Sequence, residues 1–552
     1  MVTIKNPVIW ADFPDNDVIR EDDAFYMVTT SMHSMPGCPI MKSYDLQHWE
    51  IVSYCFSRLS EKDGNNLENG QNIYGQGSWA ASLRKVGEWY YCLFNSNDDH
   101  HAYLFRTRNI ESSEWERYLL PKYMHDPSLL IDDDGRKYIV YGNHEIYITE
   151  LSDDMRSLKN SGPDRLLFTT ESENMGLKAE GSHAYKIDGR YYVLMIEWPR
   201  DGHGRRREVC YRSDSLDGPF EHRIIFDDDC GYNNAGVAQG AIFTLPGCAA
   251  EAAPDGVKLF DKKGPEDKVW AAVMFQDHGA VGRIPYVLPV VWEDGWPMLG
   301  DEGRAPKEFA LPITAPADAL YEKSDGNVIL APGVKGAKNL KDSATVCSAG
   351  DDFRRLPGQE RALTDPKHFW QWNHNPDDAL WSLKERPGYL RLINGHINDH
   401  GILQARNTLT QRTCGPKCSC RTHIDLRGLK DGDCCGLAAI QGQFGLVGVR
   451  IDDEEQFVVM CVNDGNGRER AILNKPYDAK DIWLKISFDF TANKDTAEFE
   501  YSADGKTWEK AGSLQLKYTL DHFMGCRMGL YSYATLKTGG FADFEYFLAN
   551  ED

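Results

Sequence analysis

Five segments within about the first 300 residues repeat one pattern of polar and apolar positions. Each begins with an acidic or glycine-containing turn and continues as a run of aromatic and β-branched residues, which is typical of a hairpin turn followed by a strand. The segments read REDDAFYMVTTS, KVGEWYYCLFNS, DDDGRKYIVYGN, KIDGRYYVLMIEW and GPEDKVWAAVMFQ. Hardly any helical periodicity lies between them. Five such units predict a five-bladed β-propeller of four-stranded blades.

A different pattern begins near Gly350. Short alternating strands separated by turn residues, such as DIWLKISFDF and DTAEFEYSADGKTWEKAG, predict a β-sandwich. The intervening text is rich in Ala, Pro, Gly and Lys and is typical of a linker. We therefore expect an all-β chain with a propeller over 1–305, a linker over 306–345 and a sandwich over 346–552.

Aligning the repeats on their aromatic runs brings one residue of each repeat into a common frame, just before the innermost strand. The frame residues are Asp15, Ala80, Asp126, Glu180 and Gln239, and in the first four repeats Tyr26, Tyr91, Tyr138 and Tyr192 follow eleven or twelve residues later. In a propeller this frame lies at the start of the strand that lines the central channel, so three carboxylates should converge there. The alternative is that such acids only form turns, and this alternative is favoured for Asp12 and Asp17.

Converging carboxylates suit glycoside hydrolysis. One protonated acid and one ionised base or nucleophile on either side of a glycosidic bond are the minimum that this reaction needs. A third carboxylate nearby would raise the pKa of the acid by like-charge repulsion. Trp79 and Trp198 are aromatic residues close in sequence to this frame and are candidates for the apolar floor of a sugar site, although either could equally belong to the core.

Composition excludes some partners. A net charge of −23 over 552 residues argues against nucleic acid and against an anionic membrane. No apolar run is long enough to span a bilayer, and the N-terminal sequence lacks the features of a signal peptide. These observations predict a cytoplasmic protein, with secretion left open if a leader was removed, and they allow a homo-oligomer. The cysteines near Cys418 and Cys434 lack the paired spacing of a zinc site and are read as packed thiols.

The segment NPVIWADFPDNDVIREDDAFYMVTTSMHSMPGCPIMKSYDLQHWE resembles the opening of glycoside hydrolase family 43 exo-enzymes, the β-xylosidases and α-L-arabinofuranosidases. HDPSLLIDDDGRKYIVYG and AEGSHAYKIDGRYYVLM resemble the segments that carry the family's second aspartate and its glutamate. The resemblance implies that Asp15 is the general base, Asp126 the residue that modulates the acid's pKa and positions it, and Glu180 the general acid. It also implies inversion of configuration, with base and acid roughly 6.5 to 9.5 Å apart.

The same resemblance assigns sugar-binding residues. MFQDHGAVGRIPYVLPVVWEDGWPMLG resembles the last blade, where Arg283 would bind the sugar, and His33, Met32 and Trp79 would line its pocket. Gln239 replaces a histidine that can bind a metal or its waters in some relatives. Because a neutral amide is a poorer ligand, we predict no catalytic metal, and no cofactor is implied.

The C-terminal half resembles the concanavalin-A-like jelly roll attached to such enzymes, on segments such as ARNTLTQRTCGPKCS. Trp370 and Trp372 alternate with Gln371, so both indoles should be buried on one strand face. The sandwich is then expected to wall the pocket rather than to bind glycans on an exposed face. A closed pocket suits an exo-acting enzyme.

The sequence thus predicts an exo-acting, inverting glycoside hydrolase that releases terminal α-L-arabinofuranose and/or β-D-xylose from hemicellulose fragments, with arabinofuranosidase activity slightly favoured. Two other readings remain. One is a non-catalytic propeller that only binds glycans. The other is a five-bladed phosphorylase, which would need basic residues at the channel mouth. The only dense basic run, Arg200–Val209, is read as a solvated hairpin.

Overall fold

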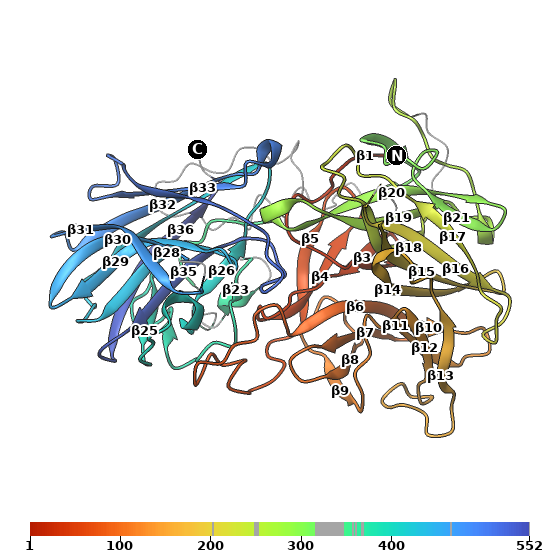
Figure 1. Ribbon diagram of the computed structural model, residues 1–552, viewed down its shortest axis with the longest axis horizontal. Coiled ribbons are helices and arrows are strands. Elements are labelled where there is room, and N and C mark those ends of the chain that lie inside the picture. Colours follow the sequence, from red (N-terminus) through yellow and green to blue (C-terminus); the bar gives the residue numbers. More distant parts are fainter. Residues whose placement is uncertain are drawn as a thin grey trace.

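The computed structural model describes residues 1–200, 202, 204–247, 253–314, 347–355, 358, 362–365, 369–463 and 466–550. Two all-β domains lie side by side, the N-terminal domain in red to green and the C-terminal domain in teal to blue (Figure 1). Within the described residues the helical elements are short 3₁₀ turns, η1 (Pro265–Asp267), η2 (Gly279–Val281), η4 (Ala362–Thr364), η6 (Gly401–Gln404) and η7 (Thr491–Asn493). None of these has the length and hydropathy that a membrane span requires.

Five antiparallel four-stranded sheets follow one another in chain order and form the predicted propeller. Blade 1 contains β2 (Asp17–Glu21), β3 (Ala24–Val28), β4 (Gly37–Ser43) and β5 (Glu50–Phe56). Blade 2 contains β6 (Ser78–Val86), β7 (Trp89–Ser96), β8 (His101–Thr107) and β9 (Glu116–Leu120). Blade 3 contains β10 (Ser128–Ile131), β11 (Lys137–Asn143), β12 (Glu145–Glu150) and β13 (Asp164–Thr169).

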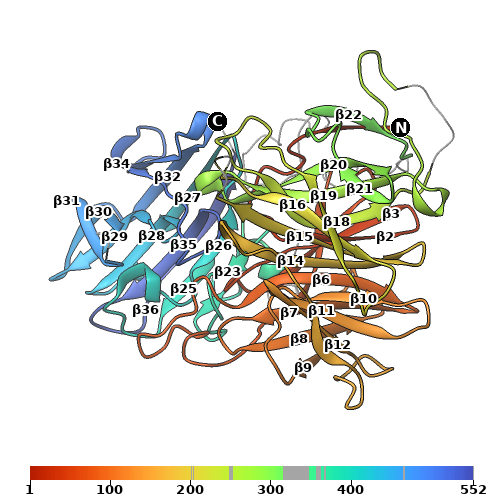
Figure 2. The same ribbon diagram turned by 45° about the vertical axis from the view of Figure 1, so that its right-hand side comes forward.

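Blades 4 and 5 complete the ring, which Figure 2 shows from a second direction. Blade 4 contains β14 (Met175–Ile187), β15 (Arg190–Pro199), β16 (Arg207–Ser213) and β17 (Glu221–Phe226). Blade 5 contains β18 (Val237–Thr244), β19 (Trp270–Asp277), β20 (Arg283–Glu293) and β21 (Trp296–Leu299). Outside the blades, β1 (Val2–Lys5) pairs antiparallel with β22 (Glu308–Leu311), so the chain's start is tied to the strand that follows blade 5.

The aromatic runs form the second strand of each blade because neighbouring blades cover both of its faces. Every residue of β3 is buried, and only the last residue of β19 is not. Strands covered on both sides need continuous apolar sequence rather than strict alternation. This requirement explains why the five runs were recognisable in the sequence.

The C-terminal domain is a sandwich of two seven-stranded antiparallel sheets. The first sheet has the order β23 (Gln371–Trp372), β26 (Leu409–Arg412), β35 (Arg527–Ala534), β28 (Asp433–Ile440), β29 (Gly445–Asp452), β30 (Glu455–Asn463) and β31 (Glu469–Pro476). The second has the order β24 (Trp381–Ser382), β25 (Leu390–Asn394), β36 (Gly540–Ala549), β27 (Lys417–Asp425), β32 (Asp481–Asp489), β33 (Thr496–Ser502) and β34 (Glu509–Gln515).

Alternation is clear in the sandwich, where each sheet has one inner face. Along β32 buried residues alternate with partly exposed ones from end to end, as a strand with one covered face requires. Trp370 and Trp372 are both buried, as predicted. Cys418 and Cys420 on β27 are buried free thiols, which confirms the reading of packed cysteines.

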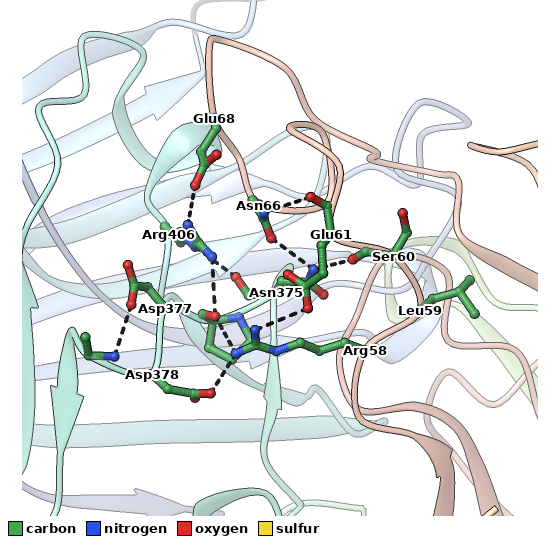
Figure 3. Close-up of polar contacts among 12 residues, drawn as sticks. Arg58, Leu59, Ser60, Glu61, Asn66, Glu68, Asn375, Asp377, Asp378 and Arg406 are labelled. Atoms are coloured by element: carbon green, nitrogen blue, oxygen red, sulfur yellow. Dashed lines mark hydrogen bonds and ion pairs between the residues drawn. The ribbon is translucent and has the colours of Figure 1, made fainter. Parts of the chain in front are cut away.

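The two domains share a core and a polar seam. One apolar cluster continues from blades 4 and 5 into the sandwich, and Met35 and Trp372 exchange two backbone hydrogen bonds across the interface. Beside them, Arg58 contacts Asp378 at 2.7 Å, and Arg406 contacts Glu68 at 2.6 Å (Figure 3). The sandwich is therefore fixed against the propeller. Most of the predicted linker, 315–345, lies outside the described residues.

Candidate active site

Asp15 lies just before β2 and is held by an arginine from the opposite end of the propeller sequence. Its side chain is buried, and its Oδ1 accepts a hydrogen bond from Nη1 of Arg283 at 2.9 Å. Arg283 begins β20 of blade 5 and is also buried. Asp15 has φ +55°, in the left-handed region that non-glycine residues rarely adopt. A strained backbone and a buried ion pair together fix the direction of this carboxylate.

Asp126 lies just before β10 with φ +44° and is also buried. Its Oδ2 accepts the backbone N–H of Gly181 at 3.1 Å. Burial, together with the charges of Glu180 and Asp15, raises the pKa of Asp126 to about 7, against the lowering effect of His125. The three predicted carboxylates therefore act on one another electrostatically, as a shared site requires.

Glu180 lies within β14 and keeps about a fifth of its side chain exposed. Its Oε2 accepts hydrogen bonds from Nε2 of His125, at 3.0 Å, and from the side-chain amide of Asn143. Both donors reach the same oxygen. This arrangement orients the carboxyl group of Glu180 from its Oε2 side.

The pairing of the blade tyrosines places Glu180 one residue away from the frame that the sequence suggests. Across the first hairpin of blades 1 to 4 the pairs are Ile19–Tyr26, Arg84–Tyr91, Leu130–Tyr138 and Tyr185–Tyr192. In the first three blades, the residue that pairs with the tyrosine lies four positions after the frame residue. In blade 4 the tyrosine pairs with Tyr185, and the residue four positions before Tyr185 is Gly181 rather than Glu180. Gly181 thus holds the left-handed position, with φ +69°. Counted from Gly181, Tyr192 follows eleven residues later, as Tyr26 and Tyr91 follow the frame residues of blades 1 and 2, so Glu180 precedes the frame by one residue.

His125 belongs to this site although the sequence reasoning did not single it out. Its Nε2 is 3.0 Å from Glu180 and 3.6 Å from Oδ2 of Asp126, and its Nδ1 is 3.1 Å from the hydroxyl of Tyr123. Burial lowers the pKa of His125, but the two carboxylates outweigh it and raise the value to about 9. The imidazole is therefore cationic at neutral pH. Its position in HDPS, directly before Asp126, was the available signal.

The ligand atoms of His125, Asp126 and Glu180 lie within 4.8 Å of one another, a spacing that a metal ion could bridge. The hydrogen bond between Nε2 of His125 and Oε2 of Glu180 also explains why these two side chains lie close together, with a shared proton in place of a metal ion. A protonated imidazole cannot ligate a metal. The absence of a catalytic metal stays a prediction, and no step below uses one.

The sandwich contributes an aromatic ring to this group of residues. Phe523, from the segment between β34 and β35, has its ring 4.6 Å from the guanidinium of Arg283 and 5.2 Å from the ring of Trp79. Trp79 lies on β6, is partly exposed, and is also 6.4 Å from the His125 ring. The sequence reasoning expected a wall from the second domain but did not identify Phe523.

Asp12 and Asp17 have structural contacts. Asp12 accepts the backbone N–H groups of Arg283, at 2.8 Å, and of Gly525 in the sandwich, at 2.9 Å. Asp17 is buried in an ion pair with Arg84 of blade 2 at 2.7 Å. Each side chain ties separate parts of the fold together, which goes beyond the turn-forming role that the sequence favoured.

The structure places His33 in the interface between the domains and Met32 beside the start of β6 in the propeller. The His33 ring is fully buried and packs 4.8 Å from Tyr74 and 4.9 Å from His374. Met32 is buried, and its backbone forms a bridge with Ser78. The sugar-binding role of His33 and Met32 stays a prediction.

Gln239 lies at the frame position of blade 5, with φ +57° and a buried side chain. A Cβ at Gly181 would lie 2.7 Å from the amide carbon of Gln239, and with φ +69° a larger residue there would also be strained. The backbone N–H of Gln239 donates to Oε2 of Glu208 at 2.7 Å. Gln239 therefore packs against Gly181, the neighbour of Glu180, and its predicted role in substrate binding stays a prediction.

The chain's similarities agree with this geometry. Residues 4–241 match the family model Glycosyl hydrolases family 43, and residues 364–550 match the model Beta xylosidase C-terminal Concanavalin A-like domain. A curated relative, a beta-xylosidase of Formosa agariphila, is 27% identical over 609 residues, covering 100% of this chain and 90% of the relative.

Solved structures of GH43 proteins span the whole chain. A bifunctional GH43-CE protein of Bacteroides eggerthii is 37% identical with a TM-score of 0.84, and this chain spans 64% of its length. A GH43 enzyme engineered to display both endo-xylanase and exo-arabinofuranosidase activity is 27% identical with a TM-score of 0.79, at 100% coverage of both chains. Fold, site and similarity together define a glycoside hydrolase. The chain carries a glycoside hydrolase family 43 domain over residues 4–241, followed by a concanavalin A-like C-terminal domain over residues 364–550.

Proposed function

We propose that this hydrolase is exo-acting and inverting, and that it releases terminal α-L-arabinofuranose and/or β-D-xylose from hemicellulose fragments. The observation that carries the proposal is the meeting of Asp15, Asp126 and Glu180, from three blades, next to Arg283. Carboxylates from separate blades can lie on opposite sides of one glycosidic bond, as hydrolysis by an acid and a second carboxylate requires.

In the proposed reaction Asp15 is the base that removes a proton from the attacking water. Glu180 protonates the leaving oxygen, and its contacts through Oε2 favour Oε1 as the proton donor. Asp126 positions the Glu180 segment through the N–H of Gly181 and adds negative charge beside the acid. Arg283 binds sugar hydroxyls, since its Nε and Nη2 have no hydrogen-bond partner among the described residues.

The choice between the two sugars rests on relatives. One relative carries the name beta-xylosidase, and the engineered neighbour displays exo-arabinofuranosidase activity. We favour the arabinofuranoside slightly, on the GRIPYVLPV and ARNTLTQRT segments. The substrate in this proposal is a pentose-containing oligosaccharide. A cytoplasmic location remains a prediction.

A phosphorylase is less well supported. The basic run at Arg205, Arg206 and Arg207 is not solvated as the sequence suggested, because each guanidinium forms an ion pair, with Asp227, Asp277 and Glu197 respectively. Neutralised arginines make a poor phosphate site.

The test is a panel of nitrophenyl pentosides, including the α-L-arabinofuranoside and the β-D-xyloside, with wild type and Glu180→Ala. We expect the wild type to hydrolyse at least one of them without phosphate, and the variant to lose most activity on substrates with poor leaving groups. Hydrolysis of neither pentoside, or full activity of the variant on a poor leaving group, would refute the proposal.

A further inference from the structure

A tryptophan is exposed on the strand next to Glu180. In the first hairpin of blade 4, Glu180 on β14 pairs with Ile196 on β15, and Leu177 pairs with Trp198. Trp198 has 41% of its surface exposed. Among the described residues, the other large hydrophobic side chains that are exposed are all aliphatic. An exposed indole beside a catalytic group offers an apolar face on which a sugar ring can pack.

Trp198 is connected to the catalytic group through Arg206. The Arg206 guanidinium is 5.7 Å from the Trp198 ring centroid and forms an ion pair with Asp277 of blade 5. Asp277 pairs across the hairpin with Arg283, the partner of Asp15. The indole and the guanidinium therefore lie where blades 4 and 5 meet, at the edge of the carboxylate group.

The direction of the substrate follows from the acid. Glu180 must touch the oxygen of the leaving group, so the departing part of the substrate begins at Glu180. Trp198, two residues beyond the strand partner of Glu180, is the exposed aromatic side chain nearest along that hairpin. Indole faces bind the apolar faces of sugar rings, and a guanidinium donates hydrogen bonds to hydroxyl groups.

We propose that Trp198 and Arg206 form a platform that binds the leaving-side sugar of an oligosaccharide substrate. The inference rests on the proposed function. Such a platform makes the enzyme prefer carbohydrate leaving groups over small alcohols. It does not contribute to the binding of a free monosaccharide in the terminal-sugar position.

The test measures binding by calorimetry in a Glu180→Gln background, which prevents turnover. The probes are β-1,4-xylotriose and arabinofuranosyl-xylotriose, compared with free xylose and arabinose. Trp198→Ala is expected to weaken binding of at least one oligosaccharide about tenfold, while affinity for the monosaccharides is unchanged. Trp198→Phe should restore most of the loss. Leu166→Ala, which truncates a side chain 43% exposed on β13 of blade 3, is the matched control and should change nothing.

The outcomes separate the two proposals. Equal oligosaccharide affinity with and without the indole would overturn the platform and leave the proposed function intact. An equal loss for oligosaccharides and monosaccharides would place Trp198 on the terminal sugar and would also overturn the platform. A Glu180→Gln parent that binds none of the four sugars would overturn the proposed function together with the platform.

Discussion

Oδ1 of Asp15 lies 2.9 Å from Nη1 of Arg283, and both side chains are buried. The first blade and the last blade of the propeller thus meet in one ion pair. The pair couples the proposed base to the proposed sugar ligand, so that a substrate positioned by Arg283 is also positioned against Asp15. Substitution of either residue is therefore expected to disturb both water activation and sugar binding.

Asp15→Ala should lose turnover on every substrate, by about 10²- to 10⁴-fold, because water activation is needed whatever the leaving group. The measurement is kcat on nitrophenyl and on unactivated pentosides. Azide or formate should restore part of the activity by replacing the missing carboxylate. An Asp15→Ala enzyme that remains active on the nitrophenyl substrate would exclude Asp15 as the base.

The pH dependence of kcat/KM should show the titration of Asp126. Its pKa is raised to about 7 by burial and by neighbouring carboxylates, and the cationic His125 opposes this rise. In His125→Asn the opposing charge is gone, so the inflection near pH 7 should move to higher pH. Asp126→Asn should abolish it. The control is His400→Asn, at an exposed site in the sandwich. An inflection unchanged in both site variants would contradict this assignment.

Phe523→Ala should lower kcat/KM about 10- to 100-fold, because the ring that lies between Trp79 and Arg283 is removed. The melting temperature should change little, since Phe523 is only partly buried. Leu520→Ala, in the same segment and 76% exposed, is the control for loop disturbance. If both variants kept wild-type kinetics, the sandwich would have no part in the site.

The domain interface should weaken in acid. His33, His374 and His522 are buried around Tyr74, and burial lowers the pKa of His374 to about 3 and of His522 to about 4. The unfolded chain binds protons at these groups below about pH 6.5, and the folded protein does not. Stability is therefore fully present above about pH 6.5 and falls below it, by about 1.4 kcal/mol per pH unit for each histidine.

The measurement for this prediction is the melting temperature between pH 7 and pH 4. His522→Phe keeps the ring that stacks on Tyr74 at 4.1 Å but cannot take up a proton, so it should flatten the decline. His400→Phe, at an exposed site, should leave the slope unchanged. A wild-type slope in His522→Phe would show that this histidine does not titrate on unfolding.

The two domain types and the convergence of Asp15, Asp126 and Glu180 could be predicted because the aromatic strands and acidic turns repeat locally. The exact frame of Glu180 could not, because Tyr192 follows it by twelve residues just as Tyr138 follows Asp126, and only the strand pairing shows that Gly181 holds the frame position. Phe523 and the interface position of His33 depend on how the two domains pack, with contacts separated by hundreds of residues. Such contacts leave no periodic signal in the sequence.

The most direct test of the central claim is the anomeric form of the first sugar released, followed by proton NMR during hydrolysis of a nitrophenyl pentoside that the enzyme accepts. The account predicts the inverted anomer first, α-xylose from a β-xyloside or β-arabinofuranose from an α-arabinofuranoside, and no release by Asp15→Ala. Initial appearance of the retained anomer would show a covalent sugar–enzyme intermediate and would contradict Asp15 as a base that activates water.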